Sequence, residues 1–212
     1  MAVTEPTAEQ AARAERTRQG DGSPLNLPNL ITLSRLILAL FLFWMIGTGR
    51  MWVASAVVFV VAAATDFFDG YIARKYGLVT KLGRILDPFV DKVIVIGAFV
   101  FLLAWPQSGV TAWMGMAVIG REMFVTSLRS VLESEGKDFS AVWSGKVKMA
   151  LQCVAVTVSL LSLSATFGPE SPYGREFIIL RDVLLWSAVA VTLYSGYVYV
   201  VRAISLFRRQ SP

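Results

Sequence analysis

Long apolar runs constrain this chain more than any other feature. There are six of them, at roughly residues 29–48, 51–73, 86–105, 110–132, 143–166 and 177–205. Each approaches or exceeds the ~20 apolar residues needed to cross the hydrocarbon core of a bilayer. Because a spanning segment must satisfy its backbone hydrogen bonds internally, separate runs of this length predict helices. The sequence therefore predicts an all-α, polytopic membrane protein with six transmembrane helices.

The basic residues are distributed unevenly around these runs. Of the twenty Lys and Arg residues, only Arg50, Arg175 and Arg181 fall on one side of the predicted helices. Cytoplasmic loops of membrane proteins carry the excess of Lys and Arg, so the other side, which holds both termini, is predicted to be cytoplasmic. Because the basic residues flank the apolar runs, the net charge of +5 is explained by membrane orientation and by contact with anionic lipid, and not by binding of nucleic acid.

The first 25 residues differ from the rest of the chain. They are polar, mix acidic and basic side chains, and lack the apolar stretch of a signal peptide. We expect residues 1–25 to be disordered or associated with the membrane surface, and residues 26–208 to form one six-helix domain. No internal repeat is visible, which disfavours transporter folds built from two related halves.

Four aspartates lie at the cytoplasmic ends of the second and third predicted helices. Asp66 and Asp69 are three residues apart, and Asp87 and Asp91 are four apart. Each spacing places two carboxylates on one helical face, and the short connecting loop makes the two pairs face each other. Two carboxylates about 4 Å apart repel by about 4 kcal/mol at an effective dielectric near 20. Bound divalent cations would remove that repulsion.

The available residue types narrow the choice of metal. The chain contains no histidine, and oxygen ligands suit Mg²⁺, Mn²⁺ or Ca²⁺ better than zinc. Two such ions sharing carboxylates suit displacement at phosphorus, where attacking and leaving oxygens both carry negative charge. A single aspartate near a helix end would more often be a cap or a solvated residue. Two pairs on adjacent helices do not fit that explanation.

Small and basic residues accompany the aspartates. Gly70 and Ala73 would let a flat base or a pyrophosphate approach the helix backbone, and Arg74 could then make a bidentate contact with a phosphate. Taken alone, the two small residues are explained better by tight helix packing.

The string from Asp66 to Asp91 resembles the signature of the CDP-alcohol phosphatidyltransferase family, D-x-x-D-G-x-x-A-R-x8-G-x3-D-x3-D, and matches every fixed position. The resemblance implies a six-helix membrane fold, usually dimeric, with its active site at the cytoplasmic face. It implies that Asp66, Asp69 and Asp87 hold two divalent ions, Mg²⁺ or Mn²⁺. Asp91 would join the metal site and act as general base.

The same resemblance assigns residues to the CDP part of the lipid donor. These are Gly70, Ala73, Arg74, Thr80 and Gly83. Asn29 and Thr32 lie at the cytoplasmic end of the first predicted helix, within reach of the donor headgroup, and we include them in the donor site.

Three further segments resemble the bacterial phosphatidylglycerophosphate synthases within this family. They are residues 26–35, residues 120–122 together with Arg129, and residues 145–152. The likeness implies transfer from CDP-diacylglycerol to the 1-hydroxyl of sn-glycerol 3-phosphate, giving phosphatidylglycerol phosphate and CMP at a bacterial inner membrane. The same chemistry on phosphatidylglycerol, inositol phosphate or serine is the alternative reading. A divalent-cation transporter is a more distant one.

A group of cations near the cytoplasmic ends agrees with an anionic acceptor. We expect the acceptor phosphate to bind among Arg121, Arg129, Lys146, Lys148 and Arg35. Arg121 lies deep enough to be unfavourable without a partner, and Glu122 could be that partner for structural reasons alone. Lys146 and Lys148 could equally be ordinary anchors at the end of a membrane helix. The sequence leaves open which cation touches the phosphate.

Overall fold

The computed structural model describes residues 27–76, 81–134 and 143–208. Inside these ranges, the side chains that are not described belong to residues 27–32, 66–76, 81–88, 91, 144 and 207–208. The expected N-terminal segment, residues 1–25, lies outside the described residues.

All regular structure in the described ranges is helical. The elements are α2 (Leu27–Thr48), α3 (Trp52–Tyr76), α4 (Lys81–Leu102), the 3₁₀ helix η1 (Pro106–Ser108), α5 (Ala112–Ser134), α6 (Trp143–Ser162) and α7 (Gly174–Arg208). The predicted all-α class is confirmed, and each predicted run overlaps one α-helix.

Some helix ends differ from the prediction. The run at 86–105 corresponds to α4, which begins earlier and ends at Leu102, and the run at 143–166 corresponds to α6, which ends at Ser162. Just past both ends, backbone N–H groups bond to carbonyls three residues back. This tighter pattern is common where an α-helix finishes. Hydropathy does not reveal such ends, because the chain stays apolar beyond them.

Within the described part of the chain, two helices have the length and hydropathy of a complete membrane span. They are the segments Gly145–Ser162 of α6 and Gly174–Leu206 of α7. Leu33–Thr48, Trp52–Thr65 and Lys92–Leu102 are apolar over shorter stretches. These findings support a membrane protein, whereas six spans remain a prediction.

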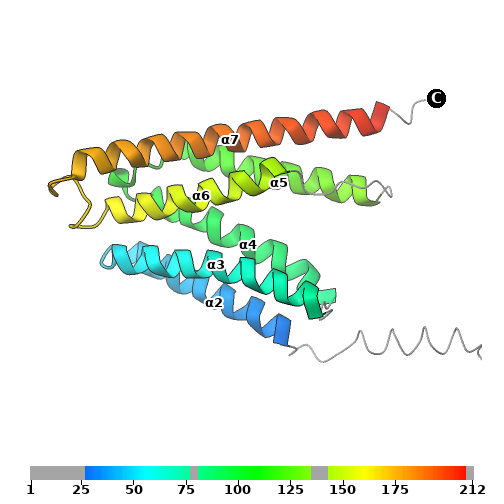
Figure 1. Ribbon diagram of the computed structural model, residues 1–212, viewed down its shortest axis with the longest axis horizontal. Helices are drawn as coiled ribbons and strands as arrows, with labels where there is room; N and C mark the ends of the chain where they lie inside the picture. Colours follow the sequence, from blue (N-terminus) through cyan, green and yellow to red (C-terminus); the bar gives the residue numbers. More distant parts are fainter. Residues whose placement is uncertain (1–26, 77–80, 135–142, 209–212) are drawn as a thin grey trace, which may run out of the picture.

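Figure 1 shows consecutive helices running in alternating directions, with the first and last described residues at the same end of the bundle. We call this end the terminal end. The opposite end carries η1 and the connection between α6 and α7, and we call it the loop end. The chain passes from α3 to α4 and from α5 to α6 at the terminal end.

Apolar side chains from most of the helices form one continuous core. Leu42, Phe59, Phe99, Leu160 and Leu185 are fully buried and come from α2, α3, α4, α6 and α7. Inside a bilayer, where lipid tails are as apolar as these side chains, their close van der Waals packing stabilises the contacts between the helices.

A second, smaller apolar cluster holds α5 against α7 near the terminal end. It consists of Val125, Leu132, Tyr199 and Ala203. This packing brings the last turns of α7 to the helix that carries Arg121.

Candidate active site

The four aspartates of the motif lie on α3 and α4 at the terminal end. Asp66 and Asp69 fall in the last three turns of α3, and Asp87 and Asp91 in the first three turns of α4, at about 3.6 residues a turn. Figure 1 shows the end of α3 beside the start of α4. The backbone thus agrees with the predicted meeting of the two pairs. The four carboxylates themselves lie outside the described side chains.

The donor set fits divalent metal ions by its chemistry. Four aspartates come from two adjacent helix ends, in a chain without histidine, and oxygen ligands are what Mg²⁺ and Mn²⁺ prefer. Among the residues whose side chains are described, no group of three or more His, Cys, Asp or Glu residues gathers.

Six of the seven predicted donor residues lie at the terminal end of the bundle. Helical positions are described for Asn29, Thr32, Gly70, Ala73, Arg74 and Gly83. The structure does not describe the side chains of these residues. Thr80 belongs to the segment 77–80, of which the structure describes neither backbone nor side chains. Their roles stay predictions.

A buried ionic cluster lies between α5 and α6. Oε1 of Glu122 accepts a hydrogen bond from Nη1 of Arg121 at 3.0 Å and another from Nζ of Lys148. The three side chains are 11%, 9% and 7% exposed, respectively. Such burial is tolerated because the carboxylate is shared between the two cations. The expected pairing of Arg121 with Glu122 is confirmed. Lys148 is an additional partner.

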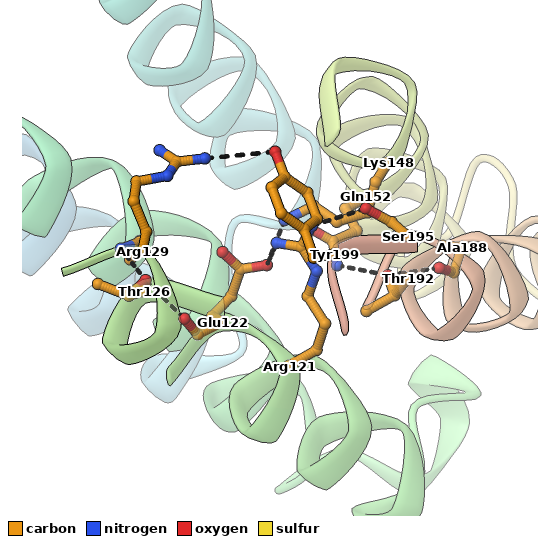
Figure 2. A network of polar contacts seen from close by, with 11 residues as sticks. Arg121, Glu122, Thr126, Arg129, Lys148, Gln152, Ala188, Thr192, Ser195 and Tyr199 are labelled. Carbon is orange, nitrogen blue, oxygen red and sulfur yellow. Dashed lines mark hydrogen bonds and ion pairs between the residues drawn. The ribbon is translucent and has the colours of Figure 1, made fainter. Parts of the chain in front are cut away.

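Helix α7 adds two polar side chains to this cluster. Oγ of Ser195 accepts a hydrogen bond from Nη2 of Arg121 at 2.6 Å, and the hydroxyl of Tyr199 accepts one from Nη2 of Arg129 at 3.3 Å. The Tyr199 ring centroid lies 5.4 Å from Cζ of Arg121 and 5.8 Å from Cζ of Arg129. Both distances are within the range of cation–π contacts. Figure 2 shows the Tyr199 side chain between the two arginines.

We call Arg121, Arg129, Lys148 and Glu122 the cation cluster. Its three cations and one carboxylate leave a net charge of +2. The Nε atoms of Arg121 and Arg129 are buried and have no hydrogen-bond partner among the described residues. Buried N–H groups are normally satisfied, so an anion with several oxygen acceptors is the ligand that this cluster fits.

Hydrogen bonds connect the cation cluster to the helix that carries Asp91. Nζ of Lys92 donates to Oγ1 of Thr126 at 2.5 Å, and the same hydroxyl donates to the backbone carbonyl of Glu122 at 2.6 Å. A cavity of about 420 Å³ opens beside them, and it is lined by Phe89, Lys92, Ile96, Glu122, Met123, Thr126 and Ser127. The cavity therefore extends from Lys92, the neighbour of Asp91 in the sequence, to Glu122 of the cluster.

The other two predicted acceptor residues lie elsewhere. Lys146 is exposed on α6, because a step of two residues from Lys148 turns a helix by about 200°. Arg35 is buried on α2, at 4% exposure, whereas the cation cluster belongs to α5 and α6. Both stay predictions as acceptor ligands.

Sequence reasoning missed the contribution of α7. Thr192, Ser195 and Tyr199 are polar residues spaced three and four apart in a largely apolar stretch of α7, and all three are buried. That spacing places them on one face. Oγ1 of Thr192 also accepts a hydrogen bond from Nε2 of Gln152, at 2.9 Å. A polar stripe at helical spacing was the signal in the sequence that pointed to this face.

Comparisons with known proteins show the family of this chain. A CDP-diacylglycerol–glycerol-3-phosphate 3-phosphatidyltransferase of Bacillus subtilis (strain 168) is 37% identical over 82% of this chain and 93% of its own length. A protein of the same name from Rickettsia bellii (strain RML369-C) is 34% identical, with the same coverage. A probable phosphatidylglycerophosphate synthase of Mycobacterium tuberculosis (strain ATCC 25618 / H37Rv) is 34% identical over 84% of this chain and 82% of its own. The family profile described as CDP-alcohol phosphatidyltransferase matches residues 25–194, and the chain belongs to that family.

Proposed function

We propose that this enzyme transfers the phosphatidyl group of CDP-diacylglycerol to the 1-hydroxyl of sn-glycerol 3-phosphate and releases CMP. The names of its relatives support the reaction. The acceptor choice rests on the cation cluster, whose net charge of +2 and buried Nε groups suit the dianion of a phosphate monoester. Serine has no phosphate, and phosphatidylglycerol carries a single negative charge on a diester. Inositol phosphate shares the monoester and is the alternative.

Members of this family generally depend on divalent metal ions. Asp66, Asp69, Asp87 and Asp91 would hold two of them, Mg²⁺ or Mn²⁺. When bound, such ions neutralise charge on the pyrophosphate and on the leaving CMP. Residues on α2, α3 and α4 from the family motif and the opening segment would bind the rest of the donor headgroup.

Each remaining step falls to a side chain of this protein. Asp91 accepts the proton of the 1-hydroxyl, and a positioned base contributes about 10²–10⁴ in rate. The hydroxyl oxygen attacks the phosphorus that carries the diacylglycerol, and the bond from that phosphorus to the CMP oxygen breaks. Arg121, Arg129 and Lys148 bind the acceptor phosphate. They thereby hold the hydroxyl toward Asp91, across the cavity between α4 and α5.

We also propose how the protein sits in the membrane. Six helices would span a bacterial inner membrane, with both termini and the active site on the cytoplasmic side. The alternating helix directions and the basic terminal end support this arrangement. Residues 26–208 would form the catalytic domain, and the enzyme would work as a homodimer.

The deciding experiment measures CMP release from CDP-diacylglycerol by purified protein in detergent with Mg²⁺. Release that needs glycerol 3-phosphate and stops with EDTA supports the proposal. Release with inositol phosphate, serine or phosphatidylglycerol alone would keep the reaction class and overturn the acceptor. Metal flux in proteoliposomes without CMP release would favour a cation transporter.

Asp91→Asn tests the assignment of the base. We expect turnover to fall by about 10²–10⁴ at saturating metal and acceptor. Asp182→Asn is the matched control, because Asp182 is a half-exposed aspartate at the loop end. Near-normal turnover of Asp91→Asn would remove Asp91 from this role without affecting the acceptor assignment.

A further inference from the structure

Tyr199 occupies the centre of the cation cluster, although it is not a predicted site residue. Its side chain is buried, with 2% of the residue exposed. The ring lies within cation–π distance of both Arg121 and Arg129, and the hydroxyl accepts a hydrogen bond from Arg129. One side chain from α7 thus contacts two guanidinium groups that lie about two turns apart on α5.

Apolar side chains and two glycines surround Tyr199 and restrict the position of its ring. Val125, Leu132 and Ala203 pack with it in the second apolar cluster. A Cβ atom added at Gly145 would lie 3.4 Å from the Tyr199 hydroxyl, and one added at Gly196 would lie 3.3 Å from Cγ of Arg121. The two glycines therefore leave just enough space for the tyrosine and the arginine beside it.

The contacts of Tyr199 leave particular donors available. Stacking on the ring uses the guanidinium faces and leaves the N–H edges for hydrogen bonds. Arg121 directs Nη1 to Glu122 and Nη2 to Ser195, while its buried Nε has no partner among the described residues. Nε of Arg129 is likewise buried without a partner among the described residues, while its Nη2 donates to the tyrosine hydroxyl. The arginines are thus held by some N–H groups, while others stay available to an anion.

We propose that Tyr199 is a positioning residue, which orients Arg121 and Arg129 so that both bind the phosphate of the acceptor. The inference rests on the proposed function and deepens it, because it names the residue that sets the geometry of the acceptor site. Tyr199 touches neither the reacting hydroxyl nor the lipid donor in this scheme. Its loss should therefore raise the KM for the acceptor and leave the KM for the donor unchanged.

The test compares two substitutions of Tyr199 with the same substitutions at Tyr197. Tyr199→Phe keeps the ring and removes the hydroxyl, and we expect the KM for glycerol 3-phosphate to rise about threefold. Tyr199→Leu removes the ring as well, and we expect a rise of about 30-fold. Tyr197 is a matched control, since it lies on the same helix and is 66% exposed. Tyr197→Phe and Tyr197→Leu should leave both KM values unchanged.

Four quantities are measured for each variant: kcat, the KM for each substrate, and the temperature of unfolding. A graded rise in acceptor KM from Phe to Leu, at constant donor KM, supports the inference. If both KM values rise equally and the unfolding temperature falls, the role of Tyr199 is merely structural and the inference is overturned. If Tyr199→Leu does not fold, Tyr199→Phe decides by itself, and an unchanged acceptor KM would overturn the inference. Wild-type enzyme that is inactive with glycerol 3-phosphate but active with another acceptor would overturn the proposed function, and this inference with it.

Discussion

Two arginines with largely buried side chains, Arg181 at the loop end and Arg121 midway along α5, show how differently the same side chain is used. At the loop end, Arg181 directs Nε and Nη2 to the adjacent Asp182, at 2.9 and 2.7 Å, and Nη1 to the carbonyl of Gln107 at 2.6 Å. Each of its three nitrogens has a partner. At the other site, Arg121 shares Glu122 with a second cation and keeps a buried Nε without a partner among the described residues.

The surroundings of Arg181 are closed around it. Gly109 has a φ of 75°, which favours glycine, and a Cβ atom there would lie 2.6 Å from Nε of Arg181. No space is left beside that nitrogen for a ligand. Arg121 instead belongs to a cluster with surplus positive charge. Burial of a cation therefore does not distinguish the two places, whereas the buried Nε and the surplus charge around Arg121 do.

Arg121→Ala should give the largest effect on function. It removes a cation and a buried donor from the acceptor site, so we expect kcat/KM for glycerol 3-phosphate to fall by about 10²–10³. Steady-state kinetics with each substrate varied in turn would measure it. A fall of similar size caused by Arg181→Ala in folded protein would break the distinction between the two arginines.

Glu122→Gln should lower stability while leaving the site able to bind phosphate. Arg121 and Lys148 lose their shared anion, and we expect unfolding to become easier by about 3 kcal/mol. A bound anion replaces part of the lost charge, so glycerol 3-phosphate should raise the unfolding temperature more in the variant than in the wild type. Thermal unfolding in detergent, with and without that compound, measures both quantities. Equal stabilisation of the two proteins would contradict a phosphate site beside Glu122.

Arg181→Ala should reduce stability without changing the kinetics of the folded enzyme. We expect a loss of about 2 kcal/mol, because the carbonyl of Gln107 loses a donor, while the half-exposed Asp182 is solvated by water. The unfolding temperature and both KM values should be measured in one preparation. A raised acceptor KM would show that a change at the loop end affects binding at the proposed acceptor site.

Thr192→Val should give the smallest effect. It leaves Nε2 of Gln152 without its acceptor, which costs about 1 kcal/mol. Replacing both residues by apolar ones of similar shape, as in Gln152→Leu with Thr192→Val, should recover part of that loss. A change in acceptor KM in the double variant would extend the functional cluster to this pair. Unchanged kinetics would keep it structural.

The aspartate motif could be predicted from the sequence because its geometry is local. Three- and four-residue steps along one helix place carboxylates on a common face wherever the helix lies, and the structure puts both pairs at the same end. The apolar runs predicted the helices for the same reason. Lys146 and Lys148 could not be told apart in this way, because both lie in one basic stretch and only packing makes one exposed and the other buried.

The sequence by itself therefore determined the helical class, the approximate helix bounds and the positions of two aspartate pairs on the neighbouring ends of α3 and α4. Only the tertiary structure decided that Lys148 would share Glu122 with Arg121, from 26 residues away, and that Ser195 and Tyr199 would contact the arginines of α5 from 74 and 70 residues away. Those contacts depend on which helices become neighbours and how each is rotated about its axis. Rotation follows from the packing of all the helices together, and no single segment encodes it.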